Sequence, residues 1–169
     1  GGTVGGDYKA TNAGNHTASC TPDISHSAPS DVTWTMNKKT VNQVTNLFIS
    51  NVGVGYPTNS SDATSYQISM DNANWTNVPA GNDTTSYNYF DSIITSTGSR
   101  TVYVKAMNSD TANYIDKVSN FSTTVYQLSA QSNNDNLGTV SPNSYNVING
   151  ETYTTSGNVL TLLDGRVLS

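Results

Sequence analysis

The stretch "RTVYVKAMN", Arg100–Asn108, decides the fold class of this 169-residue chain. In this stretch the apolar residues Val102, Val104 and Ala106 alternate with Tyr103 and Lys105. Successive side chains of a β-strand point to opposite faces, so this pattern predicts a strand with one buried and one solvated face. We therefore expect Lys105 to point outward and the three small apolar residues to enter a core.

Other segments repeat this alternation. Apolar residues share one face at Tyr66, Ile68 and Met70, at Val32, Trp34 and Met36, and at His16, Ala18 and Cys20. Turns rich in Asn, Asp, Gly and Pro separate these short segments, which is typical of a two-sheet antiparallel sandwich. The sequence therefore predicts an all-β chain of antiparallel immunoglobulin-like β-sandwich modules in tandem, with incomplete modules at both ends.

Composition fits this interpretation better than disorder. Asn, Ser and Thr number 22, 22 and 24, whereas charged residues make up 11% and hydrophobic residues 34%. Disordered chains are poor in aromatic residues, but this chain has 10 Tyr, 2 Trp and 3 Phe. We expect many short strands with polar outer faces.

Charge and hydropathy exclude two classes of partner. The net charge is −5, and the seven basic residues are scattered except for Lys38 and Lys39, whereas a nucleic-acid interface needs a basic stripe. The chain has no apolar run of about 20 residues and no signal peptide, so we expect no membrane insertion. Because it opens with Gly1 rather than Met, we expect a processed protein or a piece of a longer one.

We expect neither an enzyme nor a bound cofactor or metal. Glu151 is the single Glu, and the Asp residues lie mainly in turns, where their side chains bond nearby amides. Cys20 is the single Cys, which excludes an internal disulfide, and its strand face predicts a small core residue rather than a nucleophile. The polar run "SNNDNLG", Ser132–Gly138, predicts a linker rather than a calcium site.

Pattern divides the chain into three predicted modules. Residues 1–39 hold two strand patterns, 40–128 hold a more complete β-sandwich, and 129–169 hold further strands with a hairpin expected around Asp164 and Gly165.

Three stretches carry resemblances to bacterial surface modules. "ATNAGNHTASCTP" with "DVTWTMNKKT", within residues 10–40, is similar to the C-terminal half of a bacterial immunoglobulin-like repeat, in which Gly14 would take a positive φ. "YQISMDNANWTNV" (66–78) and "TSTGSRTVYVKAMNSD" (95–110) resemble fibronectin-type and immunoglobulin-like domains. "GTVSPNSYNVINGETYTTSGNVLTLLDGR" (138–166) looks like the first part of an internalin-type repeat of adhesins.

These resemblances imply a secreted, extracellular, non-catalytic structural or adhesive module of a bacterial cell-surface protein, stalk or filament. Neighbouring modules or subunits are the expected partners, by donor-strand completion of the N-terminal module if the chain is a natural subunit, or within a longer protein if it is a fragment. A host or glycan ligand is a further expected partner. The alternatives are a carbohydrate-binding module of an extracellular protein and a phage virion decoration or tail domain.

Two sets of residues are candidates for contact with sugars. Four aromatic residues are candidates for stacking on glycans, with packing of Trp75 into the core as the alternative: Tyr56, Trp75, Tyr87 and Tyr89. Five Asn-x-Ser/Thr sequons would accept glycans where the source has the machinery: Asn15, Asn59, Asn74, Asn82 and Asn120.

Overall fold

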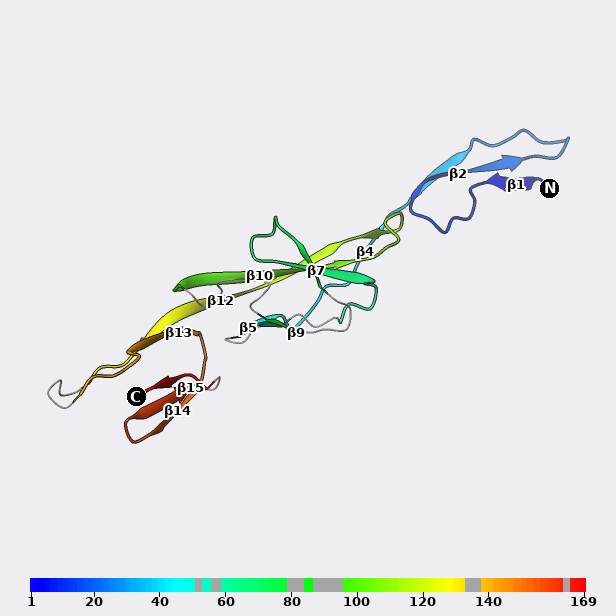
Figure 1. Cartoon of the computed structure of the whole chain (residues 1–169). Coiled ribbons are helices and arrows are strands. Elements are labelled where there is room, and N and C mark those ends of the chain that lie inside the picture. The colour runs from blue at the N-terminus through cyan, green and yellow to red at the C-terminus, as the bar shows by residue number, and fades with distance from the viewer. Residues whose placement is uncertain (51–52, 56–58, 79–83, 87–95, 133–137, 163–164) are drawn as a thin grey trace.

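The computed structural model describes residues 1–50, 53–55, 59–78, 84–86, 96–132, 138–162 and 165–169. The regular secondary structure of these described residues consists of strands, with no helix, so the predicted all-β class is confirmed. The strands form an N-terminal sheet, a central pair of sheets, a short parallel pair and a C-terminal sheet. In Figure 1 these units follow one another along the molecule, with the N-terminal sheet at one end and the C-terminal sheet at the other.

The N-terminal sheet contains three antiparallel strands in the order β1-β2-β3. Their bounds are Thr3–Gly6 for β1, Gly14–Thr21 for β2 and Val32–Met36 for β3. Gly14 opens β2 with a φ of 147°, so its predicted positive φ is confirmed.

The central unit is built around a five-stranded antiparallel sheet in the order β13-β12-β10-β7-β8. Its strands are β7 (Ser65–Ser69), β8 (Thr76–Val78), β10 (Gly98–Met107), β12 (Lys117–Ser129) and β13 (Ser144–Ile148). A second, three-stranded sheet contains β5 (Phe48–Ser50), β6 (Gly53–Gly55) and β9 (Thr84–Ser86). β4 (Lys39–Thr40) and β11 (Tyr114–Ile115) form the parallel pair.

The core lies on one face of the five-stranded sheet. Val102, Val104 and Ala106 of β10 are all 0% exposed, as their alternation predicts. They form one cluster with Tyr66 and Ile68, and with residues on the opposite side of the core: Val41, Val44, Leu47 and Ile49. Burying a Val or Ile side chain contributes about 1.5–3 kcal/mol, so this cluster is the main source of stability in the central unit.

The apolar face of the N-terminal sheet is only partly buried. The register pairs Ala18 with Val32 and His16 with Trp34, whose rings lie 4.6 Å apart between centroids. Val4 pairs with Cys20 on the same face, yet Val4 and Val32 are 56% and 63% exposed. The predicted face shared by His16, Ala18 and Cys20 is therefore confirmed, but Cys20 is only partly buried.

A joint of hydrogen bonds connects the N-terminal sheet to the central unit. The turn before β2 contacts Asn113, whose Oδ1 accepts from the Ala13 N–H and whose Nδ2 donates to Asn12 Oδ1. Lys38 Nζ donates to the carbonyl of Thr111, and the Lys39 N–H donates to the carbonyl of Asn113. The joint therefore fixes the sheet by directed polar contacts rather than by a shared core.

The C-terminal sheet has the order β14-β15-β16, with bounds Tyr153–Ser156, Val159–Leu162 and Val167–Leu168. β15 and β16 form the predicted hairpin, in which Leu160 pairs with Leu168. Arg166 links this sheet to the central unit, because its guanidinium donates to the carbonyl of Asn146 in β13 and pairs with Glu151. β13 itself lies in the predicted third module but pairs with β12, while the three module boundaries stay a prediction.

Candidate functional site

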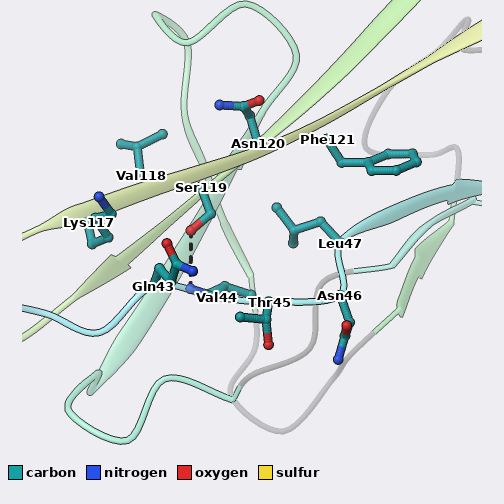
Figure 2. Close-up of a pocket in the computed structure, with 10 residues that line it drawn as sticks. All are labelled: Gln43, Val44, Thr45, Asn46, Leu47, Lys117, Val118, Ser119, Asn120 and Phe121. Atoms are coloured by element: carbon teal, nitrogen blue, oxygen red, sulfur yellow. Dashed lines mark hydrogen bonds between the residues drawn. The ribbon is translucent and has the colours of Figure 1, made fainter.

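A groove runs along one edge of β12, between that strand and residues 43–47 (Figure 2). Its volume is about 500 Å³. Five consecutive residues line each wall, Gln43–Leu47 on one side and Lys117–Phe121 on the other. Consecutive residues, rather than alternate ones, show that the groove is open to the edge of the strand and not to one face of the sheet.

The wall opposite β12 is held in place by the core. Val44 and Leu47 are 3% and 8% exposed, and both belong to the core cluster. The Val44 N–H donates to Ser119 Oγ at 3.1 Å, which is the contact drawn across the groove in Figure 2. The groove is therefore bounded by two ordered walls.

The groove lies on the side of β12 opposite β10, at a gap between two strands, β13 and β4. β13 pairs with β12 only from Val125 to Ser129, and the last bond of this ladder runs from the Asn149 N–H to the carbonyl of Thr124. At the other end, β4 pairs with β11, just before β12, and the Val41 N–H donates to the carbonyl of Ile115. Among the residues that the structure describes, no strand pairs with Lys117–Thr123 on the side opposite β10.

The register shows which backbone groups of β12 face this gap. In an antiparallel ladder, alternate residues direct both their N–H and C=O toward one neighbour. Because Thr124 bonds toward β13, the residues at even positions before it direct their backbone groups to the same side: Val118, Asn120 and Ser122. Within β12 the odd positions bond to β10, where Ser119 pairs with Val104 and Phe121 with Val102. Asp116 lies in neither β11 nor β12 and interrupts this alternation, and β4 leads directly into residues 43–47 on the groove side.

Apolar side chains are exposed beside the gap. Phe121 and Val118 are 37% and 36% exposed, on opposite faces of β12. Phe121 lies near Leu47 at one end of the groove, and Lys117 lies near Gln43 at the other (Figure 2). The site thus combines free backbone groups, an apolar end and a cationic end.

A second surface feature is Trp75, directly before β8. The register places Trp75 opposite Ser69 and on the same outer face as Tyr103 and Lys105, rather than among the core residues. Lys105 Nζ lies 4.0 Å from the centroid of the Trp75 ring, and Ser69 is 0% exposed. Lys105 is thus on the outer face, as its alternation with Val104 predicts.

Amide side chains lie beside this aromatic ring. Gln67 Nε2 donates to Asn77 Oδ1 at 2.8 Å, and Lys105 Nζ donates to Gln67 Oε1 at 3.5 Å. The outer face therefore places an aromatic ring, on which a sugar ring can stack, next to a row of side chains that can hydrogen-bond to sugar hydroxyls.

The turn before Trp75 is organised by Asp71. Its carboxylate accepts bonds from the backbone N–H groups of Asn74 and Ala73, from Asn74 Nδ2 and from Ser69 Oγ. These bonds, the Asn74 N–H first, hold the pKa of Asp71 well below its ordinary value of 3.8. Asn72 takes a φ of 59° in the same turn, a conformation that Asn tolerates better than most residues.

A third cluster surrounds Asp23 in the turn after β2. His26 Nδ1 lies 2.6 Å from Asp23 Oδ1, and the N-terminal amine and Ser25 also donate to this carboxylate. The hydrogen bond from His26, followed by that from the amine, lowers the pKa of Asp23 to about 2. Ser25 Oγ bonds to the carboxylate rather than to the imidazole, so the cluster lacks the serine-to-base contact of a nucleophilic site.

The predicted sugar-contact residues fall in two groups. Tyr56, Tyr87, Tyr89 and Asn82 lie outside the described residues, as do residues 133–137 of the predicted linker. Asn15, Asn59, Asn74 and Asn120 are all exposed. Asn59 bonds to Thr45 and Asn74 to Asp71, whereas Asn120 makes no side-chain hydrogen bond within the described part of the chain.

Within the described ranges, no three His, Cys, Asp or Glu side chains gather in a way that could hold a metal ion. The described part of the chain contains no helix able to cross a bilayer.

Comparison with protein-family models, curated proteins and solved structures gives no match to this chain.

Sequence reasoning missed the gap beside β12. The segment "KVSNFSTTVYQLS", Lys117–Ser129, forms a single strand of 13 residues. A usable signal was present, since these residues contain no Gly, Pro, Asp or Glu to end the strand or protect its edge.

Proposed function

We propose that this chain is a non-catalytic structural module of a bacterial cell-surface stalk, adhesin or filament, built from immunoglobulin-like sandwiches in tandem. The observation that carries the proposal is the arrangement of β-sheets one after another along the molecule, joined by directed contacts (Figure 1). Such an arrangement sets the position of one end of a protein relative to the other.

The two joints support this role. At the N-terminal side, Asn113 bonds to both Asn12 and Ala13. At the C-terminal side, Arg166 bonds to Asn146 and pairs with Glu151, whose side chain is only 6% exposed. Hydrogen bonds with fixed geometry orient neighbouring units, and orientation is what a stalk needs.

The outer surface supports an extracellular setting. Asn, Ser and Thr account for 68 of 169 residues, and they occupy outward strand positions such as Thr101 and Ser122, which bond to each other at 2.8 Å. A surface of this kind is hydrated by neutral hydroxyl and amide groups rather than by charges, so its hydration changes little with salt concentration.

Surface labelling tests the proposal. Antibodies raised against the chain should label intact source cells, and protease treatment of those cells should remove the signal. An antibody against a cytoplasmic protein of the same cells is the control for lysis. Labelling that appears only after the cells are opened would contradict the proposal.

Carbohydrate binding is a second candidate, because Trp75 lies on the outer face beside Gln67, Asn77 and Lys105. A glycan array should then show binding that is lost in Trp75→Ala. Tyr126→Ala is the matched control, because it removes a 52% exposed aromatic ring from a different strand, β12. An array without binding, or binding that survives Trp75→Ala, would exclude this surface as the sugar site.

A further inference from the structure

We infer that Lys117–Thr123 of β12 binds a short extended peptide of another protein, which adds a strand to the central sheet between β4 and β13. This inference goes beyond the proposed function and does not depend on it. It rests on the free backbone groups of the edge, the length of the gap and the chemistry of the groove.

The backbone of β12 offers the hydrogen bonds that strand addition uses. Val118, Asn120 and Ser122 each direct one N–H and one C=O into the gap, as the register and the bond from Asn149 to Thr124 require. Main-chain bonds of this kind give a peptide affinity for a sheet edge, and pockets for its side chains give specificity. An added strand would continue the line of β13, which already bonds to the same side of β12, and we therefore expect it to be antiparallel to β12.

The gap limits the length of the guest. The unpaired edge of β12, Lys117–Thr123, is seven residues long, which is about 23 Å at roughly 3.3 Å per residue. The β12 strand of a second copy is 13 residues long and would run into β4 and β13. The other described edge strands of a second copy have at most the five residues of β3 and β13, so each would leave part of the gap unpaired. A separate peptide of about seven residues fits better than a second copy.

The groove also specifies side chains. Its wall at one end is formed by Phe121 and Leu47, which favours an apolar residue of the peptide. Lys117 gives the other end a positive charge, which favours Asp or Glu. Because an antiparallel strand begins near Thr123 and ends near Lys117, the peptide should carry its apolar residue in the N-terminal half and its acidic residue in the C-terminal half.

A displayed library of random seven-residue peptides, selected on the folded chain, tests the inference. Selection should enrich peptides with this order of side chains. Asn120→Pro removes an N–H that faces the gap and leaves the β10 ladder intact, so it should weaken binding of the enriched peptides at least tenfold. Asn120→Ala removes the same side chain but keeps the N–H, and it should bind like the unchanged protein.

Two further measurements keep the test decisive if Asn120→Pro fails to fold. N-methylation of the peptide amides that face β12 should abolish binding, whereas methylation of the intervening amides should not. Hydrogen exchange at Val118, Asn120 and Ser122 should slow when the peptide is bound. Failure to enrich any peptide, or binding that tolerates methylation at every amide, would overturn the inference. Concentration-dependent dimerisation that Asn120→Pro abolishes would also overturn it, because the occupant would then be a second copy.

Discussion

The side-chain oxygen of Asn113 accepts a hydrogen bond from the backbone N–H of Ala13 at 2.7 Å, across 100 residues of sequence. The same amide donates to Asn12 Oδ1 at 3.0 Å and to Asp110 Oδ2 at 2.8 Å. One side chain thus connects the turn before β2 to the turn between β10 and β12. Because no residue of the N-terminal sheet belongs to the core cluster of the described residues, its orientation depends on contacts of this kind.

Replacing Asn113 with Ala should loosen the N-terminal sheet. Each lost hydrogen bond costs about 0.5–1.5 kcal/mol, which is small against the core but large for a polar joint. We expect a broader distribution of overall dimensions in small-angle X-ray scattering and faster tumbling of residues 1–36 in NMR relaxation. Asn113→Asp keeps the oxygen that accepts from Ala13 but places a second carboxylate beside Asp110 Oδ2, so it should loosen the sheet at least as much as Asn113→Ala. Unchanged scattering for Asn113→Ala would show that other contacts fix the sheet.

Replacing Ile68 with Ala should destabilise the central unit strongly. Ile68 is 0% exposed and lies in the cluster with Val102 and Val104, so its loss leaves a cavity that the rigid sheet cannot fill. Such substitutions cost about 2–5 kcal/mol. Urea unfolding of the variant measures the change in free energy. Ser99→Ala, at an exposed position of β10, is the control and should shift it by no more than about 0.5 kcal/mol.

The strands around Ile68 and Val104 could be predicted from sequence because their signal is local. Alternation within a few residues is enough to identify which residues share a face, and it held for β2, β3, β7 and β10. That face is buried in β7 and β10 but stays partly exposed in β2 and β3. The joint at Asn113 and the gap beside β12 could not be predicted in this way. Both depend on which distant segments lie side by side, such as residues 12 and 113, and a polar Asn or Ser looks the same in sequence whether it bonds or not.

Trp75 illustrates a different limit. Its alternation with Asn77 places both on one face of β8, but sequence alone does not say whether that face meets the core or the solvent. The register with Gln67 and Lys105 decides the question, because Lys105 can keep its charge in water only on the outer face. The face on which Trp75 lies could therefore be found only from the register of the sheet, and sugar binding by Trp75 stays a prediction.

Replacing Glu151 with Ala should destabilise the attachment of the C-terminal sheet. The Glu151 carboxylate is 6% exposed and lies 3.2 Å from Arg166, whose other nitrogen donates to the carbonyl of Asn146. Removing Glu151 takes away the carboxylate that accepts from Arg166, whose side chain is 22% exposed, and losing a hydrogen bond to a charged group costs about 1.5–3 kcal/mol. Thermal unfolding should show the loss, and Glu151→Gln should lose less because it retains an acceptor. Equal stability of all three proteins would show that solvent reaches this pair.

The turn at Asp71 should make the stability of the chain fall at low pH. Because its pKa in the folded chain lies below the ordinary 3.8, the folded state favours the carboxylate, and the resulting stabilisation is present above about pH 4. It is lost as the pH falls toward the lowered pKa. Asp71→Asn removes the titrating group, so it should be less stable than the unchanged protein at pH 7, and this difference should shrink as the pH falls below 4.

Fluorescence of Trp75 gives a local measurement of this effect. Trp34→Phe removes the only other tryptophan, so thermal unfolding of the turn and β8 can then be followed at Trp75 alone. Asp31→Asn is the matched control, because this carboxylate is replaced in the same way at an exposed position before β3. A constant difference between Asp71→Asn and the unchanged protein from pH 7 to pH 2 would contradict the prediction. It would mean that the shape of the side chain, and not its charge, holds the four hydrogen bonds of the turn.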